Sequence, residues 1–252
     1  MKLVQLTKKV KRPILGEFGK AVKNGVAFNY GISGGPDCDK KCTYHPVSTS
    51  RYATAETLRC YAWNTEGAFN RKALKAKQER HQLTDRNKLT ELAYKEVERK
   101  PVITWFRFSA FGSCPLTPPK LFRKLCKLLK ARKIDIHLPL ESWAKTRRYR
   151  KELGGLNIAV RRSCQSIQSF LTASIRNNPL SVVVGNKCNT RKERIRLASI
   201  VASKRAKRTG KKCIVCPAVV VSLLRINAPK AKCGSCTACA DIDLDIVYPA
   251  HV

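Results

Sequence analysis

Apolar residues follow two different spacings along the chain, most clearly after residue 101. Short runs of β-branched and aromatic residues are typical of buried strands, whereas apolar residues that recur every three or four positions indicate helices. Strands are predicted over 26–30, 102–108, 134–138, 156–160, 180–184 and 241–248. Helices are predicted over 71–100 (as one helix or as two that meet near residues 84 and 85), over 117–129, 142–153 and 166–176, and from 190 onward.

Glycine, proline and a pair of polar residues mark the expected helix ends. Pro101 ends the first helix, and Gly154 and Gly155 stop the helix before them because glycine readily adopts a left-handed conformation. Thr190 and Glu193 have the spacing of a capping box, in which two side chains satisfy free N–H groups at a helix start. A helix is therefore predicted to begin immediately after Thr190.

The alternation of strands and helices predicts an α/β fold, a parallel sheet with covering helices, either doubly wound or a partial barrel. Residues 1–209 are expected to form this core, with an N-terminal cysteine loop and a basic surface. Residues 210–252 are expected to form a small cysteine-rich metal-binding module, because they contain too little apolar material to fold alone. Loops at the carboxyl ends of parallel strands would form the functional site.

The net charge of the chain indicates a class of binding partner. The 252 residues include 51 Lys and Arg but 17 Asp and Glu, a formal net charge of +34 at pH 7. The excess is concentrated between Lys120 and Lys212, which hold 26 basic and 4 acidic residues, whereas Cys233 to Val252 contains three Asp and no Lys or Arg. Self-repulsion on this scale calls for an anionic partner, and the phosphate backbones of DNA or RNA supply dense negative charge. A solvated basic face, an anionic membrane and an acidic protein are the alternatives.

Clusters of Lys and Arg with an interleaved aromatic residue are the candidate contacts to nucleic acid, because such side chains bind phosphates and stack on bases. The candidates are Arg147, Arg148, Tyr149, Arg150, Arg161, Arg162, Lys204, Arg205, Lys207 and Arg208. The last four belong to the densest basic run, immediately before the C-terminal cysteines. Generic surface charge is the alternative interpretation of all of them.

No apolar run reaches the length of about 20 residues that a membrane-spanning helix needs, so no membrane partner is expected. The first residues lack the apolar segment and the cleavage site of a secretory signal, and the expected location is the cytoplasm. The 12 cysteines would stay reduced there, so their clustering indicates metal ligation rather than disulfides.

The C-terminal cysteines give the strongest chemical signal. Cys213, Cys216, Cys233, Cys236 and Cys239 form two close pairs, the second of which is extended by a third thiol at the same short spacing. Such a set can surround one tetrahedral zinc ion or one iron–sulfur cluster. The tight double spacing favours an iron–sulfur cluster, with zinc as the alternative.

A second group of candidate metal ligands follows the glycine-rich loop after the first predicted strand. Cys38, Cys42, His45 and Cys60 supply three thiols and an imidazole at intervals that allow them to share one metal. Structural cysteines with a surface His45 are the alternative.

Cys38, Cys42 and Tyr44 also carry a family resemblance. Their spacing resembles the loop of radical S-adenosylmethionine enzymes, in which three cysteines hold a [4Fe–4S] cluster and an aromatic residue precedes the third. His45 stands where the family has that third cysteine, and 108–116 lacks the acidic residue of the family's glycine-rich motif. The resemblance implies a partial barrel, a C-terminal auxiliary cluster and S-adenosylmethionine as a cosubstrate.

The chain further resembles an uncharacterised group of phage and mobile-element proteins with cysteine-rich ends and a Cys-Tyr-Ala step, here at 60–62. The favoured expectation is a nucleic-acid-binding metalloprotein that acts in DNA or RNA replication or processing, in the host cytoplasm if phage-encoded. The rival is a radical S-adenosylmethionine-type iron–sulfur enzyme that modifies nucleic acid. A third hypothesis places Mg²⁺ at Asp135, His137 and Glu141, as in a nuclease. No catalytic residue is assigned.

Overall fold

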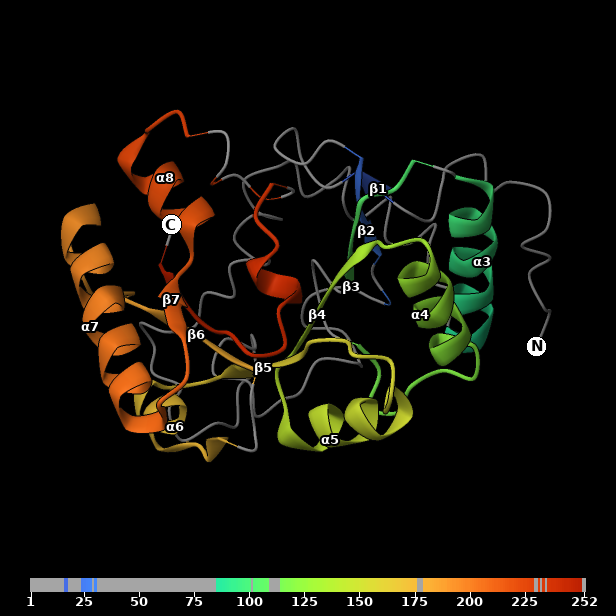
Figure 1. The fold of residues 1–252 in the computed structure, drawn as a ribbon, viewed down its shortest axis with the longest axis horizontal. Helices are drawn as coiled ribbons and strands as arrows, with labels where there is room; N and C mark the ends of the chain where they lie inside the picture. Colours follow the sequence, from blue (N-terminus) through green and yellow to red (C-terminus); the bar gives the residue numbers. More distant parts are fainter. Residues whose placement is uncertain are drawn as a thin grey trace, which may run out of the picture.

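The computed structural model describes residues 16–17, 24–28, 30, 85–100, 102–108, 114–175, 179–228, 231, 233 and 235–250. Eight strands form one sheet in the order β1-β2-β3-β4-β5-β6-β8-β7 (Figure 1). They are β1 (Gly16–Glu17), β2 (Gly25–Phe28), β3 (Trp105–Phe108), β4 (Asp135–Leu140), β5 (Val160–Cys164), β6 (Leu180–Val184), β7 (Cys213–Val215) and β8 (Asp245–Pro249). Strand β1 is antiparallel to β2, and the other neighbouring pairs are parallel. The expected α/β fold with a parallel sheet is confirmed.

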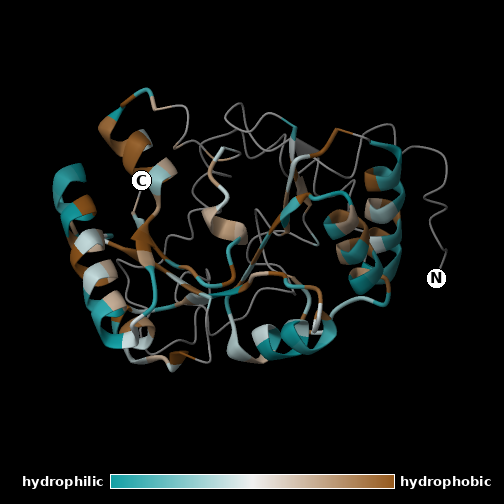
Figure 2. Ribbon diagram, viewed as in Figure 1, coloured by the Kyte–Doolittle hydropathy of each residue, from teal (hydrophilic) through white to brown (hydrophobic). Residues whose placement is uncertain are grey.

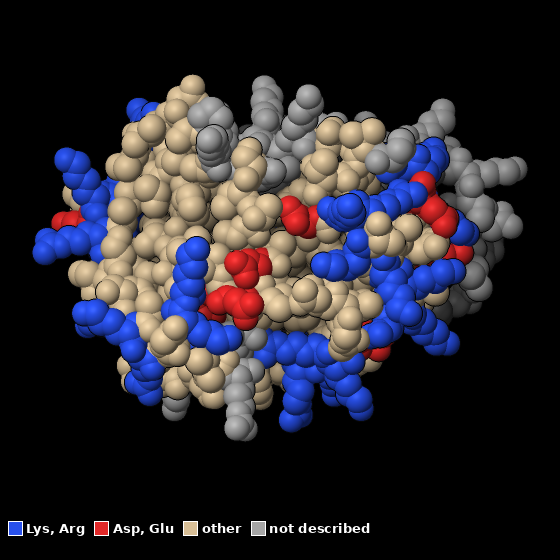
Figure 3. Space-filling view, in the orientation of Figure 1, with Lys and Arg blue, Asp and Glu red and all other residues tan. Residues whose placement is uncertain are grey.

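Helices lie around the outside of the curved row of strands in Figure 1. They are α3 (Arg86–Arg99), α4 (Phe122–Ala131), α5 (Trp143–Glu152), α6 (Ile167–Thr172), α7 (Arg191–Thr209) and α8 (Pro217–Leu224). A one-turn 3-10 helix, η3 (Ala238–Ala240), contacts β4. Figure 2 shows that α5 is largely hydrophilic, and Figure 3 shows Lys and Arg gathered over the outer helices. The expectation of a helix-covered sheet is confirmed.

Local signals place the helix ends where the sequence predicts them. Asp85 caps α3 by accepting hydrogen bonds from two backbone N–H groups, in agreement with a break near residues 84 and 85. Thr190 and Glu193 form the predicted capping box of α7. Gly155 and Gly210 follow α5 and α7 with φ angles of 78° and 66°, a region that favours glycine.

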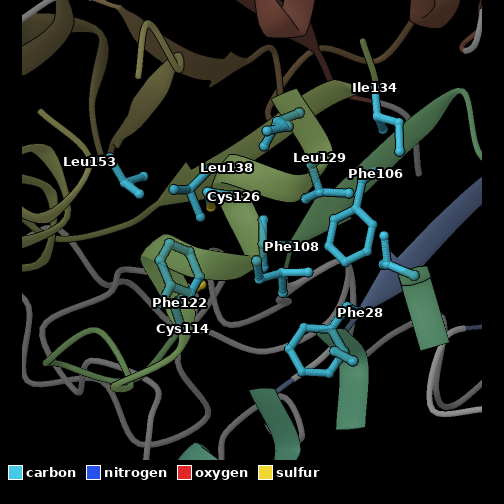
Figure 4. Close-up of a cluster of buried hydrophobic side chains, with 14 of the residues drawn as sticks. Phe28, Phe106, Phe108, Cys114, Phe122, Cys126, Leu129, Ile134, Leu138 and Leu153 are labelled. Atoms are coloured by element: carbon cyan, nitrogen blue, oxygen red, sulfur yellow. The ribbon is translucent and has the colours of Figure 1, made fainter. Parts of the chain in front are cut away.

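Aromatic rings fill the larger core, which lies between the sheet and α3, α4 and α5 (Figure 4). Phe106 and Phe108 of β3 have ring centroids 4.7 Å apart. Phe122 of α4 packs edge-to-face against Tyr149 of α5 at 4.9 Å. A second cluster, which includes Val182 and residues of α6 and α7, continues the same layer across the later strands. One face of the sheet is therefore buried under helices along its length.

The opposite, inner face of the sheet carries polar side chains. Successive residues of a strand point to opposite faces, so Arg107 and His137 point away from the helices that cover Phe106 and Ile136. Arg161 lies on the same inner face, because its neighbour Val160 belongs to the helix-covered core. The C-terminal segment containing η3 contacts this region through β4. The last cysteines are thus brought over a polar surface of the sheet.

Strand β5 differs from the prediction, which placed it at 156–160. Asn157 adopts a φ of 52°, which breaks the extended conformation, and the strand follows it at Val160–Cys164. The strand contains Arg161 and Arg162, which are charged residues that a sequence pattern assigns to a surface loop. Arg161 nevertheless lies within the sheet, because its Nη1 and Nη2 atoms donate hydrogen bonds to backbone carbonyls there. The predicted position of this strand is wrong for that reason.

Residues after 209 continue the same sheet. Strands β7 and β8 pair with each other, and β8 also pairs with β6, so both belong to the sheet that the earlier strands form. The predicted strand at 241–248 corresponds to β8, whereas β7 and α8 were not predicted. The boundary at residue 209 and the metal-binding module stay predictions.

Candidate metal centre and nucleic-acid interface

Four of the five C-terminal cysteines lie near one another. Cys216 is the N-cap residue of α8 and packs in a buried cluster with Cys239 of η3. Cys233 and Cys236 are joined by an isolated backbone β-bridge. The thiol of Cys233 lies within electrostatic range of those of Cys236 and Cys239, and Cys216 lies within range of Cys233 and Cys239. Cys216 of the first predicted C-terminal pair therefore lies near the three later cysteines.

Cys213 is separated from this group by the sheet. Its side chain packs in the cluster beneath α7, together with Val182 and Val247. The next residue, Ile214, packs on the opposite side with Cys216. Because neighbouring residues of a strand alternate between faces, the structure leaves Cys213 outside the group that the other four form.

Arg161 and Tyr248 hold the cysteine segment against the sheet. The guanidinium of Arg161 is fully buried, and its Nη1 and Nη2 atoms donate to five backbone carbonyls. The distances from Arg161 are 3.2 Å to Ala238, 3.4 Å to Cys239, 3.0 Å to Asp241, 2.6 Å to Leu244 and 3.0 Å to Leu180. The Tyr248 hydroxyl lies 3.3 Å from Sγ of Cys239. These contacts fix the backbone and the thiol of Cys239.

Burial governs the protonation of these groups. It raises the pKa of Cys216 to about 12, opposed by a backbone hydrogen bond from Val219 and supported by the charges of Cys239 and Cys233. It likewise raises the pKa of Cys233 and takes that of Tyr248 well above its usual value. Without a cation the thiols of Cys216 and Cys233 are therefore neutral at pH 7, and a bound metal would supply the charge that favours their thiolates.

Within the described ranges, no three His, Cys, Asp or Glu side chains are already arranged to hold a metal ion. The four neighbouring thiols would have to move closer together to share one. The other predicted ligands, Cys38, Cys42, His45 and Cys60, lie outside the described residues.

His137 occupies the inner face beside this segment. Its ring is 5% exposed, lies 6.0 Å from that of Trp105 and has no hydrogen-bond partner at either nitrogen within the described part of the chain. Burial, followed by the charges of Arg107 and Arg161, holds the pKa of His137 well below 6.5. Glu141, which the nuclease hypothesis needs, is ion-paired with Lys145 at 2.5 Å, so nothing in this arrangement favours a Mg²⁺ site.

Three of the ten residues predicted to contact nucleic acid are buried, so their side chains do not lie at the surface. Tyr149 packs in the aromatic core and donates from its hydroxyl to the carbonyl of Pro115, so it cannot stack on a base. Arg161 is buried beneath the cysteine segment. Arg205 forms a buried ion pair with Asp245. Each of these three side chains bonds to groups inside the protein.

The remaining candidates lie at or near the surface. Arg147, Arg148, Lys204, Lys207 and Arg208 are exposed on α5 and α7. Arg150 and Arg162 are half-buried.

Further exposed cations lie on α4, α5 and α7. They are Lys127 and Lys130 on α4, Lys151 on α5, and Arg191, Lys192 and Arg196 on α7. No ion pair joins these six, or the five exposed candidates on α5 and α7, to a carboxylate within the residues that the structure describes.

Trp143 is a candidate contact that the sequence pattern did not reveal. It is the first residue of α5 and is 41% exposed. The guanidinium carbon of Arg162 lies 5.2 Å from the centre of its ring. The one available signal was its position at the start of the helix that follows a predicted strand, a place where parallel sheets bind ligands.

Comparisons with protein-family models, with curated proteins and with solved structures give no match. Among the described helices, none combines the length and the apolar character that crossing a bilayer requires.

Proposed function

We propose that this chain is a nucleic-acid-binding metalloprotein of a phage or mobile element, which acts in DNA or RNA replication or processing. The observation that supports the proposal most directly is the set of exposed cations on α4, α5 and α7 that have no carboxylate partner among the described residues. A polyanion is the partner that neutralises such a surface over a large area.

Helix α7 carries more of these exposed cations than α4 or α5. Its 19 residues extend for about 28 Å, with Ala198, Val201 and Ala202 buried against the sheet. The exposed side carries Arg191, Lys192, Arg196, Lys204, Lys207 and Arg208. The single carboxylate of the helix, Glu193, is used in the capping box. Cations spaced along one exposed helix face suit contacts with successive phosphates.

Cys216, Cys233, Cys236 and Cys239 are the proposed ligands of the metal, an iron–sulfur cluster or a zinc ion. Their donor set fits both, because thiolates ligate either one. Arg161 adds an electrostatic reason. Its buried charge is met by carbonyl dipoles, with no carboxylate bonded to it among the described residues, and it contacts the backbone of Cys239. Four metal-bound thiolates carry net negative charge, which would offset that buried cation.

Charge reversal on α7 tests the proposed interface. We expect Lys204→Glu, Lys207→Glu and Arg208→Glu together to weaken binding to labelled oligonucleotides and to flatten the dependence of log K on log salt by about 0.9 for each lost phosphate contact. The control is Lys95→Glu with Arg99→Glu on α3, whose cations are already paired with Glu91 and Glu96. Equal loss in both variants would contradict an interface on α7.

The alternative function is a radical S-adenosylmethionine-type enzyme that modifies nucleic acid. One observation favours it, which is that β2, β3, β4, β5 and β6 are parallel neighbours in sequence order, as in a partial barrel. A fold alone does not establish an activity. Anaerobic purification with iron, sulfide and zinc analysis separates the two functions. Iron and sulfide for about two clusters per chain favour the enzyme, and zinc alone excludes it.

A further inference from the structure

Trp143 presents an indole ring at the carboxyl edge of the sheet. Strand β4 ends at Leu140, and Ser142 caps α5 by accepting a hydrogen bond from the N–H of Lys145 at 3.2 Å. This turn places Trp143 at the first position of the helix, with 41% of its surface exposed. Trp143 is not a member of the described hydrophobic clusters, so the exposed part of its ring is available to a ligand.

Arg162 supports the ring from the protein side. It lies on β5, where its register partner is Leu140, and its guanidinium carbon is 5.2 Å from the ring centre of Trp143. A cation over one face of an indole is attracted by the ring quadrupole and limits the freedom of the side chain. The ring is therefore held in place while part of its surface stays open to solvent.

Two exposed cations continue along the helix from the ring. Arg147 and Lys151 follow Trp143 by four and eight positions, a spacing that places them on the same side of α5. Neither forms an ion pair with a carboxylate among the described residues. An aromatic ring followed by cations along a groove or helix is the combination with which proteins bind single strands.

We propose that Trp143 is a stacking platform for an unpaired base of single-stranded DNA or RNA, with Arg147 and Lys151 as contacts to the adjoining phosphates. The inference rests on the proposed nucleic-acid binding and adds that the bound nucleic acid is single-stranded. In a duplex the faces of the bases are covered by their neighbours, so the ring could stack only on an unpaired or terminal base. Selectivity between the bases is not expected, because every base has a face that stacks.

Binding of the full chain to labelled oligonucleotides of about 12 nucleotides tests the inference, with single-stranded DNA, single-stranded RNA and a duplex as three arms. We expect Trp143→Ala to weaken single-strand binding by roughly 5- to 150-fold and duplex binding much less. Trp143→Phe keeps a ring and should retain most of the affinity. Ile226→Ala, at a residue that is 53% exposed away from α5, should change nothing.

Indole fluorescence gives a second readout. Stacking on Trp143 should quench part of the wild-type emission, and this quenching should be lost in Trp143→Phe while the unfolding midpoint stays unchanged. If Trp143→Ala binds single strands as tightly as the wild type while charge reversal on α7 still weakens binding, the platform is refuted and the proposed function survives. If the wild type binds none of the three oligonucleotides, both fail.

Discussion

Arg205 and Asp245 form an ion pair inside the protein, between α7 and β8. Nε of Arg205 donates to Oδ2 of Asp245 at 2.9 Å, and both side chains are excluded from solvent. Oδ1 of the same carboxylate accepts the N–H of Leu180 at 2.7 Å. The pair therefore links α7 to two neighbouring strands, β6 and β8, and fixes the strand that follows the cysteine segment.

We predict that Arg205→Met lowers the free energy of unfolding by about 3–5 kcal/mol, because it leaves the Asp245 carboxylate buried without its cation. Arg205→Met combined with Asp245→Asn should be less destabilising, since the amide still accepts from Leu180 without burying a charge. Urea unfolding of both variants provides the comparison. As a control, Lys95→Met removes an exposed pair with Glu91 and should have little effect. A double variant less stable than the single one would refute this account.

Arg161→Met should destabilise the protein by more than about 3 kcal/mol, because up to five carbonyls lose their donor in a buried place. Residues 238–244 should then become more accessible to protease than in the wild type. Limited proteolysis with mass spectrometry locates the cleavage. Arg148→Met, at an exposed position of α5, should leave both stability and cleavage unchanged. Wild-type protection of 238–244 in the Arg161 variant would show that this segment does not depend on the guanidinium.

Cys213 lies on the helix-covered face of the sheet, so the proposed metal site should depend on Cys239 and not on Cys213. Cys239→Ser should lower the metal content of the purified protein, whereas Cys213→Ser should leave it near the wild-type value. Elemental analysis of proteins purified side by side measures this difference. Equal metal loss in the two variants would mean that the ligand set includes Cys213 and that the four-cysteine assignment is wrong.

The buried His137 should make the free energy of unfolding depend on pH. Its pKa in the folded protein lies well below 6.5, so under mildly acidic conditions the unfolded chain binds a proton that the folded protein does not. Its contribution to stability is complete above about pH 6.5 and is lost as the pH falls, by about 1.4 kcal/mol per pH unit. Unfolding free energies between about pH 7 and about pH 5 should show this slope. In His137→Phe the slope should become shallower, and an unchanged slope would assign it to other groups.

Local sequence signals predicted much of the fold. The β-branched run at 180–184 became β6, and the Thr190–Glu193 capping box begins α7. These features depend on residues close together in the chain, which is why the sequence alone was sufficient. The strand at 156–160 was misplaced because its apolar residues pack beside the core, while the real strand contains Arg161.

The candidate interface was harder to predict, because partners far apart in the sequence determine which cations are buried. Arg161 and Arg205 resemble surface residues until their partners at 238–245 are placed beside them. Tyr149 and Trp143 lie on one helix, yet the first is in the core and the second is exposed. The sequence pattern favoured Tyr149 because its flanking arginines resembled a binding motif, whereas the aromatic residue at the surface of this helix is Trp143.

The affinity of the purified 252-residue chain for DNA and RNA as a function of salt tests the central claim most directly. The account predicts tight binding at low ionic strength and a loss of about 10³–10⁵ in affinity between about 50 mM and about 200 mM salt, as expected if 6–10 phosphates are contacted. Failure to bind either nucleic acid at low ionic strength would contradict it, because the exposed cations of α4, α5 and α7 would then have another partner.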